Sequence, residues 1–263
     1  MPEPANHVGV VPLRDAADVH DYGGKASCLA RLASLGLPVP DGFCISSGAA
    51  THLTRTTLEQ IQDHLQRLST KHVAVRSSAS LEDSLISSLA GIFRSELEVP
   101  ATVSDVVDAI SKVVGSLSSE TLLPYLHRLG IHNELKMAVL VQIMLKPEVA
   151  GVLFTCDPIT KRSDFVIEAL RNKAGSVQAG RGIPTRLVVE RKGSIGLASS
   201  PQYEPAASSA VLDPRTVTTL INLALKCEDI LGSGQDIEWA VQRSSVWILQ
   251  SRPITGLMEE SDG

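Results

Sequence analysis

The sequence predicts an α+β fold with two lobes and a cleft between them. Helical patterns are concentrated in the first half of the chain, whereas the segments after Glu134 are short and β-rich. Helices followed by a run of strands favour an α+β arrangement with a mostly antiparallel sheet. The chain has 263 residues, of which 43% are hydrophobic, so it can bury a sizeable core. We expect an N-terminal lobe over 1–134, a C-terminal lobe over 135–257 and a tail over 258–263.

The first half holds most of the expected helices. From Gly23 to Leu37 apolar residues recur with the 3.6-residue period of a helix, and Gly36 followed by Pro38 ends that pattern. The other expected helices cover 56–68, 103–114 and 122–129, and the expected strands cover 42–46 and 73–75.

The second half predicts a sheet with one long helix. The expected strands cover 137–145, 151–155, 164–169, 187–191, 236–241 and 246–250. The helix covers 216–231 and ends at Gly232. The stretch 193–205 is rich in Ser, Gly and Pro, which predicts a surface loop.

Composition narrows the class of protein. The formal net charge is −5 and aromatic residues make up 3%, which argues against a nucleic-acid-binding protein with its usual basic stripe. The four cysteines are widely spaced, so we expect free thiols in a reducing compartment. The N-terminus shows neither a basic nor an apolar leader pattern, and the apolar runs are shorter than a membrane span. We therefore expect a soluble cytoplasmic protein with no nucleic-acid or membrane partner.

The segment from Asp236 to Pro253 alternates with the period of two that is typical of strands. One expected face is apolar and consists of Ile237, Trp239, Val241, Trp247 and Leu249. The other face is polar and consists of Asp236, Glu238, Gln250 and Arg252. A hairpin centred on Ser244 places Glu238 opposite Gln250 and Asp236 opposite Arg252, and a bulge at the turn would shift this register.

This polar face predicts a site for a metal ion and a phosphate. Mg²⁺ prefers oxygen ligands and is usually held by one or two carboxylates together with phosphate oxygens. A guanidinium beside it matches the geometry of a phosphate. The alternative is a solvated sheet face that carries two cross-strand polar pairs.

Two cationic residues of the first half are candidates for phosphate binding. Lys25 follows two glycines at the start of an expected helix, where the backbone can approach an anion closely. Arg76 ends an expected strand and precedes two serines, which suits an anion clamp. A common turn is the alternative interpretation of the first pattern, and a surface salt bridge with Glu82 or Asp83 is the alternative interpretation of the second.

A further glycine turn lies around Gly91, with the hydroxyl of Ser95 nearby. Such a turn can wrap a phosphate with backbone N–H groups. An ordinary hairpin turn is the alternative interpretation.

Taken together, these segments resemble the ATP-grasp ATP-binding domain shared by pyruvate phosphate dikinase, phosphoenolpyruvate synthase and rifampin phosphotransferase. The resemblance runs from about Asp21 to Thr255, and its seven short motifs occur in the family's order. They are Gly23–Ser27 with the helix end Gly36–Pro40, Val75–Asp83, Ala90–Gly91, Val141–Gln142, Gly151–Pro158, Asp236–Trp239 and Gln250–Pro253.

The resemblance implies ATP and Mg²⁺ as ligands and gives roles to individual residues. The implied phosphate-contacting cations are Lys25 and Arg76, and the implied Mg²⁺ ligands are Glu238 and Gln250. The other implied contacts are those of Gly91 and Ser95 in the phosphate loop, of Gln142 in the nucleotide pocket, and of Asp236 and Arg252 beside the metal. As in the family, Lys25, Arg76 and Arg252 are the candidate catalytic residues.

The sequence also departs from the family. The family's Gly-Leu-Gly-Glu motif is replaced by Asn172–Gly175, and Thr185 stands where relatives usually carry Asp. Relatives have a phosphohistidine domain with a Thr-Ser/Cys-His signature, and none of the seven histidines here lies in that context.

We therefore expect an ATP-dependent phosphotransferase component. It would pass a phosphoryl or pyrophosphoryl group to a histidine on a separate carrier protein, and from there to a small-molecule acceptor. A stand-alone small-molecule kinase or ATP-dependent ligase is one alternative. A non-catalytic nucleotide-binding regulatory subunit, suggested by the altered 172–175 stretch, is the other.

Overall fold

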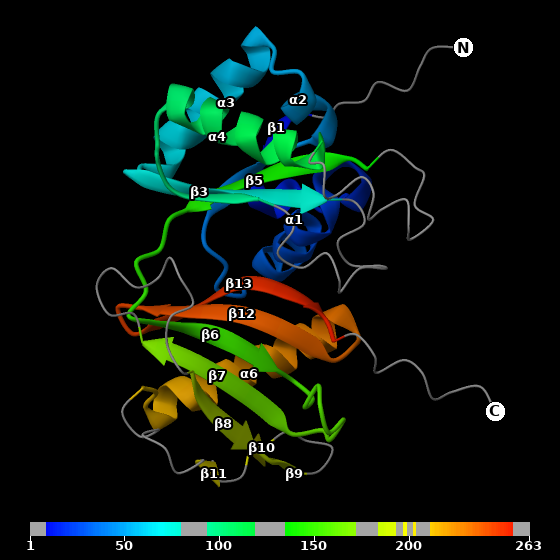
Figure 1. The fold of residues 1–263 in the computed structure, drawn as a ribbon, viewed down its shortest axis with the longest axis vertical. Coiled ribbons are helices and arrows are strands. Elements are labelled where there is room, and N and C mark those ends of the chain that lie inside the picture. The colour runs from blue at the N-terminus through cyan, green and yellow to red at the C-terminus, as the bar shows by residue number, and fades with distance from the viewer. Residues whose placement is uncertain are drawn as a thin grey trace, which may run out of the picture. The chain divides into compact units, whose positions relative to one another are not determined.

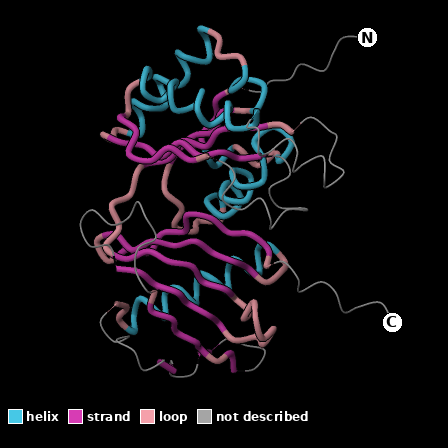
Figure 2. The backbone as a smooth tube through the Cα atoms, in the orientation of Figure 1, coloured by secondary structure: helices cyan, strands magenta, loops and turns pink. Residues whose placement is uncertain are grey.

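The computed structural model describes residues 9–79, 94–118, 135–171, 184–192, 197–198, 202–203 and 211–254. They form two compact units, each built from an antiparallel sheet and helices (Figures 1 and 2). Unit 1 comprises Met1–Ser34 and Pro40–Met144, and unit 2 comprises Leu35–Val39 and Leu145–Gly263. The predicted α+β class is confirmed.

Unit 1 contains a five-stranded antiparallel sheet with helices on both faces. In spatial order its strands are β1 (Val10–Pro12), β2 (Gly42–Ile45), β5 (Met137–Ile143), β3 (His72–Ala79) and β4 (Ser95–Pro100). The helical elements are η1 (Leu13–Asp15), α1 (Val19–Ser34), α2 (Ser47–Thr51), α3 (Arg55–Leu68), α4 (Val103–Gly115) and η3 (Ser116–Ser118). Figure 1 shows α3 and α4 on one side of β3 and β5, with α1 on the other.

Alternation along the strands of unit 1 decides which residues enter the main core. Val75 of β3 and Val141 of β5 are paired and point to the same face, where they are fully buried with Phe43. Ile61 of α3 and Ile110 of α4 complete this cluster. Burial of such aliphatic side chains stabilises the unit by about 1.5–3 kcal/mol each.

The boundary between the units lies after β5, at 144/145, and not at the expected 134/135. β5 pairs with β2 and β3 inside the unit 1 sheet, so unit 2 resumes at Leu145. The sequence prediction grouped this strand with the strands that follow it along the chain. Pairing with strands that lie much earlier leaves no signal in the local sequence. Unit 1 also has more strands than expected, since β1 and β4 were not predicted.

Unit 2 contains a six-stranded antiparallel sheet with one long helix on one face. The strand order is β11 (Gln202–Tyr203), β8 (Thr185–Val189), β7 (Phe165–Arg171), β6 (Val149–Phe154), β12 (Gln235–Gln242) and β13 (Ser245–Pro253). A separate hairpin joins β9 (Arg191–Lys192) to β10 (Leu197–Ala198). The predicted loop over 193–205 therefore contains two short strands, β10 and β11, and the predicted helix over 122–129 lies outside the described residues.

The helix α6 (Pro214–Leu231) has clear start and stop signals. The Asp213 side chain accepts hydrogen bonds from the backbone N–H groups of Arg215 and Thr216, and Pro214 occupies the first turn. Gly232 ends the helix in the left-handed conformation, with φ of 78°. Its buried residues, which include Leu220 and Ala224, cover the same sheet face as Trp239. No helix among the described residues combines the length and apolar character needed to cross a membrane.

The helix α1 contains a kink at Gly23, where φ is 76°. A Cβ atom at this position would lie 2.2 Å from the carbonyl oxygen of Ser78 on β3. The glycine therefore permits both the left-handed backbone and the close approach of α1 to β3. Beyond the kink, Ala26 N donates to the Ser78 hydroxyl over 2.9 Å, which fixes the helix against the strand.

Replacing this glycine should weaken unit 1. We expect Gly23→Ala to lower the free energy of unfolding by at least about 1–3 kcal/mol, because it combines backbone strain with a steric clash. Urea denaturation measures the effect. Gly48→Ala is the matched control, since a Cβ at Gly48 of α2 would meet nothing within 4 Å, and its stability should be unchanged or slightly higher. Equal stability of Gly23→Ala and the wild type would contradict this account.

Candidate functional site

The hairpin of β12 and β13 closes through a two-residue turn. Arg243 and Ser244 have φ of 51° and 62°, and Gln242 pairs with Ser245 on either side of them. Positive φ at both central residues is the conformation that matches the right-handed twist of two paired strands. The turn is tight, so the register of the following residues is set from this point.

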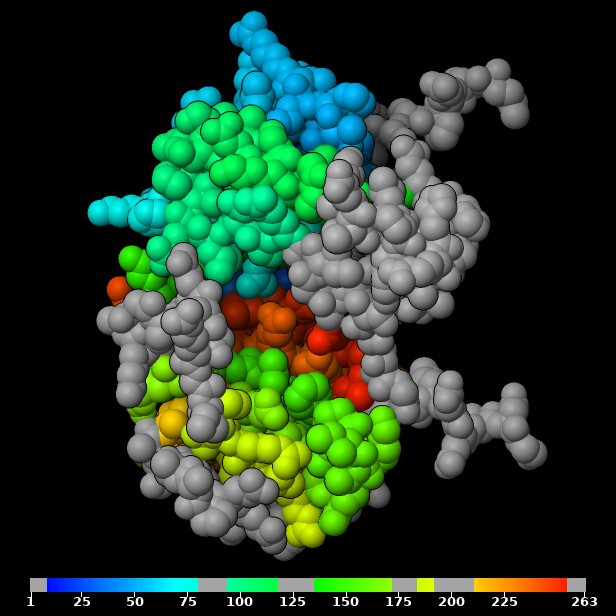
Figure 3. Space-filling model, in the orientation of Figure 1, coloured from blue at the N-terminus to red at the C-terminus, as the bar shows by residue number. Residues whose placement is uncertain are grey.

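The register places the predicted residues as expected. Glu238 lies opposite Gln250, and Asp236 lies opposite Arg252. Residues directly opposite each other in an antiparallel pair point to the same face, so all four side chains share one face of the unit 2 sheet. In the space-filling view, atoms of β12 and β13, coloured orange to red, reach the visible surface of unit 2 (Figure 3).

The predicted apolar face needs a correction for two residues. A bulge lies between the Glu238–Gln250 and Trp239–Ile248 pairs, so Leu249 is the extra residue of β13. Trp247 consequently pairs with Ala240 and shares the face of Glu238, not that of Trp239. The buried face is completed by Val246 and Ile248 instead.

Asp236 and Arg252 form an ion pair that leaves one carboxylate oxygen unused. Oδ2 of Asp236 accepts from Nε and Nη2 of Arg252 over 2.8 and 2.7 Å. Oδ1 is buried and has no hydrogen-bond partner among the described residues. Burial raises the pKa of Asp236, and the Arg252 guanidinium acts in the opposite direction. A buried acceptor of this kind costs free energy unless a ligand or a water satisfies it.

The donor set on this face fits a magnesium ion. The unused Oδ1 of Asp236, the Glu238 carboxylate and the Gln250 amide oxygen are hard oxygen ligands on adjacent strands. In the described part of the chain no group of three or more His, Cys, Asp or Glu side chains is placed so that it could hold a metal ion. A site on this face would therefore rely on the amide and on phosphate oxygens as well as on the two carboxylates.

The same face carries a second charged cluster that the sequence prediction missed. Glu168 of β7 pairs with Arg186 of β8, and Val152 of β6 connects this row to Glu238. Arg186 Nη2 lies 3.3 Å from Asp157 Oδ2, and its Nε lies 4.0 Å from Glu168 Oε1. The alternation of Phe165–Arg171 already separates Glu168 from the buried Phe165 and Ile167, so this residue was recognisable from the sequence.

Asp157 is anchored by the loop that follows β6. Its Oδ1 accepts from the backbone N–H groups of Ile159 and Thr160 over 2.8 and 3.1 Å. Burial acts to raise the pKa of Asp157, but these hydrogen bonds and the Arg186 guanidinium hold the pKa below its ordinary value. The sequence signal was Asp157 before Pro158, a pattern typical of such turns.

In unit 1 the side chain of Lys25, on α1, reaches the strand that carries Arg76. Lys25 Nζ donates to the carbonyl oxygen of Ser77 over 3.2 Å, one residue from Arg76. Arg76 lies opposite Ser95 of β4, so these two side chains share a face. Ser78, on the same face by strand alternation, binds the backbone of α1. Gly91 lies outside the described residues.

Gln142 lies further along the same sheet. It is opposite Ala74, which shares the face of Arg76 by alternation. Its side chain is 3% exposed, and its Nε2 donates to the carbonyl oxygen of Pro40 over 3.0 Å. The amide is thus oriented by the chain segment that leads into β2.

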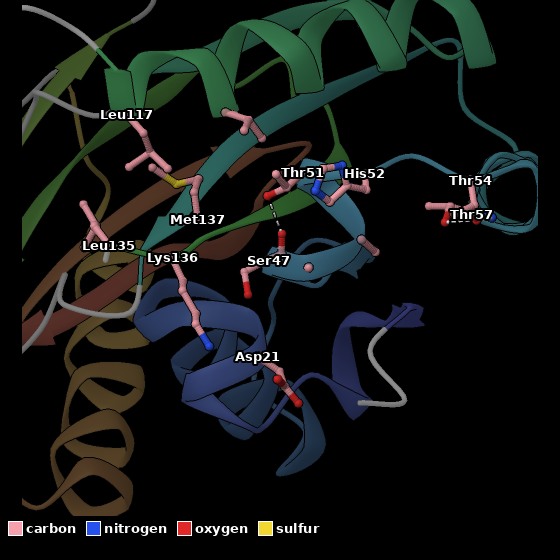
Figure 4. Close-up of a pocket in the computed structure, with 13 residues that line it drawn as sticks. Asp21, Ser47, Thr51, His52, Thr54, Thr57, Leu117, Leu135, Lys136 and Met137 are labelled. Atoms are coloured by element: carbon pink, nitrogen blue, oxygen red, sulfur yellow. Dashed lines mark hydrogen bonds between the residues drawn. The ribbon is translucent and has the colours of Figure 1, made fainter. Parts of the chain in front are cut away.

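Unit 1 also contains an open pocket of about 700 Å³ (Figure 4). Its lining includes Asp21 of α1 and Lys136, together with hydroxyl-bearing residues of α2 and α3. Several of these hydroxyls already bond within the lining: Thr51 donates to the carbonyl oxygen of Ser47, and the hydroxyls of Thr54 and Thr57 are 2.9 Å apart. None of the predicted site residues lines this pocket.

The two units thus carry different parts of the predicted site: the cations Lys25 and Arg76 belong to unit 1, and the carboxylate-bearing sheet face belongs to unit 2. The comparison with known families is specific. Residues 51–263 match the family of the pyruvate phosphate dikinase AMP/ATP-binding domain, and the chain belongs to this family. The predicted ATP-grasp resemblance is thereby confirmed, and Lys25 lies outside the matched residues.

Similar curated proteins extend this match over more of the chain. The chain is 27% identical to a probable phosphoenolpyruvate synthase of Archaeoglobus fulgidus, over 94% of this chain and 41% of that protein. It is 28% identical to a rifampicin phosphotransferase of Streptomyces, over 94% and 36%. It is 29% identical to the prodigiosin synthesizing transferase PigC of Serratia marcescens, over 90% and 32%. The chain thus spans less than half the length of these relatives.

Among solved structures, D-alanine–D-alanine ligase from Bacillus anthracis, in complex with ATP, matches with a TM-score of 0.42 and 10% identity. The match covers 88% of this chain and 55% of that one.

Neutralising Asp157 should change stability in a pH-dependent way. A carboxylate whose pKa is lowered by folding stabilises the folded state above its ordinary pKa of 3.8, and this contribution is lost as the pH falls through the folded-state pKa. Asp157→Asn keeps the hydrogen-bond acceptor but removes the charge. Urea unfolding should show the variant less stable than the wild type near pH 7, with the difference shrinking below pH 3.8.

Asp63 is an exposed residue of α3, and Asp63→Asn is the control for charge removal alone. A stability difference for Asp157→Asn that stays constant from neutral to acidic pH would show that the carboxylate charge is not what stabilises this loop.

Proposed function

We propose that this chain is the ATP-binding part of a phosphotransferase, which binds Mg²⁺-ATP and positions its terminal phosphates for transfer. The observation that carries the proposal is the pairing of Glu238 with Gln250 and of Asp236 with Arg252 on one face of β12 and β13. These residues occur in a chain that belongs to an AMP/ATP-binding domain family.

Each residue has a role that follows from its charge and its fixed position. Asp236 holds the Arg252 guanidinium through Nε and Nη2, so that the arginine is already oriented on the polar face when a phosphate arrives. Lys25 and Arg76 supply positive charge to the phosphates, which are otherwise disfavoured by the net charge of −5. Glu238 and Gln250 hold Mg²⁺, which when bound neutralises charge on the phosphates.

Catalysis of phosphoryl transfer depends mainly on positioning and on electrostatic stabilisation. Preorganised cations are effective because they need no rearrangement when negative charge develops. The contact of Lys25 with the β3 backbone and the ion pair of Arg252 provide such preorganisation.

We propose that the acceptor is a histidine of a separate carrier protein, which passes the phosphoryl or pyrophosphoryl group to a small molecule. This is supported by the sequence contexts of the seven histidines, none of which matches the Thr-Ser/Cys-His signature. Incubation with labelled ATP, with and without a candidate carrier, tests it. An acid-labile phosphoprotein should form only with the carrier, and turnover of a small acceptor by this chain alone would favour a kinase or ligase instead.

The altered stretch Asn172–Gly175 favours a second candidate, a nucleotide-binding regulatory subunit. Tight ATP binding without ADP or AMP formation, with any carrier or small acceptor, would support that function over transfer.

Removing the Glu238 carboxylate should abolish Mg²⁺-dependent ATP binding. Glu238→Ala deletes a metal ligand, while the hairpin keeps its other pairs. A thermal-shift titration of ATP with and without Mg²⁺ measures this effect, because a ligand stabilises the state to which it binds. Asp229→Ala on the exposed side of α6 should behave like the wild type. If Mg²⁺ enhances ATP binding equally in Glu238→Ala, the assigned metal ligand is wrong.

Removing the Arg76 guanidinium should slow transfer. We expect Arg76→Ala to cost on the order of 3 kcal/mol of transition-state stabilisation, about a hundredfold or more in rate, by analogy with the loss of one preorganised donor. Single-turnover ATP consumption with the acceptor measures it. The control is Arg55→Ala, whose side chain is 92% exposed and pairs with Glu59 on α3. An unchanged rate for Arg76→Ala would count against its assignment.

A further inference from the structure

A network of polar side chains lies behind the polar face of unit 2, on the side covered by α6. It begins at Gln235, which is fully buried and directly precedes Asp236. The backbone N–H of Gln235 donates to the Thr155 hydroxyl over 2.8 Å, and its carbonyl oxygen accepts from the Thr155 N–H over 2.9 Å. The start of β12 is thus tied to the end of β6 by a reciprocal pair of hydrogen bonds.

The side chain of Gln235 extends the network to the neighbouring strand. Its Oε1 accepts from the Ser251 hydroxyl over 2.8 Å, and Ser251 lies between Gln250 and Arg252. Its Nε2 donates to the carbonyl oxygen and the hydroxyl of Ser233 over 3.0 Å each. The amide therefore links the segment before β12 with β13 through one buried side chain.

The helix α6 closes the network through an ion pair. The hydroxyl of Thr155 donates to Glu228 Oε1 over 3.0 Å, so the donor and an acceptor site of this one hydroxyl are both used. The other oxygen of Glu228 accepts from Arg191 Nη2 over 2.9 Å. That nitrogen also donates to the carbonyl oxygen of Thr155 over 3.0 Å, and the guanidinium lies 4.4 Å from the centre of the Phe165 ring.

The alternation of side chains connects this network to the opposite face. Gln235 and Ser251 point toward α6, so Asp236, Gln250 and Arg252 must point away from it. A slip of one residue in either strand would exchange the two faces, and the bulge at Leu249 shows that the register of β13 is not uniform. Bonds that fix Gln235 and Ser251 therefore also fix the residues of the polar face.

We propose that Thr155, Glu228 and Arg191 are positioning residues for the metal and phosphate residues of β12 and β13. The link of these three residues to Mg²⁺ rests on the proposed function, whereas their role in positioning β12 and β13 does not. None of the three is among the predicted site residues. Thr155 contacts the backbone of Gln235, whereas Glu228 contacts the Thr155 hydroxyl and Arg191 contacts both Glu228 and the Thr155 carbonyl oxygen. Partners that orient metal ligands in this way typically change metal affinity by about 10–100-fold when they are removed.

Substitutions of Thr155 test the proposal. Thr155→Val keeps the shape but removes the hydroxyl, and Thr155→Ser keeps the hydroxyl. We expect Thr155→Val to raise the Mg²⁺ concentration for half-maximal ATP binding about tenfold, and Thr155→Ser to remain within about twofold of the wild type. Calorimetric ATP titrations at several Mg²⁺ concentrations measure this. Equal Mg²⁺ dependence in the wild type and Thr155→Val would overturn the proposal.

A core variant separates positioning from general destabilisation. Ile221→Val shortens a buried side chain of α6 that has no part in the network. We expect it to leave the Mg²⁺ dependence unchanged although it lowers stability. If Ile221→Val and Thr155→Val raise the Mg²⁺ requirement equally, the effect is one of stability, and the positioning role is refuted.

A second pair of variants covers the case in which Thr155→Val does not fold. Glu228→Gln removes the charge that Arg191 contacts, and Asp229→Asn neutralises the adjacent exposed residue of α6. Glu228→Gln should raise the Mg²⁺ requirement severalfold, and Asp229→Asn should not. An unchanged requirement in Glu228→Gln would contradict the proposal.

Amide hydrogen exchange distinguishes failure of this inference from failure of the proposed function. In the ligand-free chain, Thr155→Val or Glu228→Gln should speed amide exchange at Gln235, Asp236 and Glu238 about tenfold or more. In Ile221→Val, the exchange rates of these three amides, relative to those of other amides in unit 2, should equal the wild-type values. If the wild type shows no Mg²⁺-dependent ATP binding, the proposed function fails, and the exchange rates still judge the positioning. Unchanged protection at these amides would overturn the positioning role by itself.

Discussion

The pairing of β12 with β13 decides which side chains of unit 2 stand together. The tight turn at Arg243 and Ser244 sets the register, and the bulge at Leu249 then shifts it by one residue before Gln250. Without that shift, the residues that pair as Glu238–Gln250 and Asp236–Arg252 would not lie directly opposite each other. The proposed metal and phosphate site depends on this local geometry, because each strand alone supplies only half of its residues.

Burial on the reverse side of the sheet makes that geometry rigid. Trp239 and Ile248 are paired and almost completely buried, so a slip of either strand would expose a large apolar area. The polar network around Gln235 adds directional bonds to this packing. Apolar burial keeps the strands together, whereas the hydrogen bonds specify which pairs are formed.

In unit 1 the corresponding constraint is the close contact of α1 with β3. Gly23 lets the helix approach Ser78, and this approach brings Lys25 to the backbone beside Arg76. The glycine that the sequence suggested as an anion-binding turn therefore has a structural explanation of its own. The structural and the anion-binding explanations of this glycine are compatible, because the contact of α1 with β3 also brings Lys25 to the strand that carries Arg76.

Period-two alternation was sufficient to predict the polar face of the hairpin, and a count from Ser244 was sufficient for its main pairs. The bulge left no mark in the sequence, so Trp247 was assigned to the wrong face and Leu249 was given a regular position in the strand. The position of β5 was missed for a related reason, since its partners lie far away along the chain. Charged contacts such as that of Asp157 with Arg186 join loops to strands, and composition and periodicity carry no information on such pairs.

The proposed site requires that Glu238 and Gln250 approach the same divalent ion. Paramagnetic broadening by Mn²⁺ in the presence of ATP tests it directly in the isotope-labelled chain, because the effect falls steeply with distance from the ion. We expect the amide signals of Glu238 and Gln250 to broaden together at low Mn²⁺, while those of α6 residues such as Ala224 remain sharp. Broadening confined to one strand, or centred elsewhere in the chain, would contradict it.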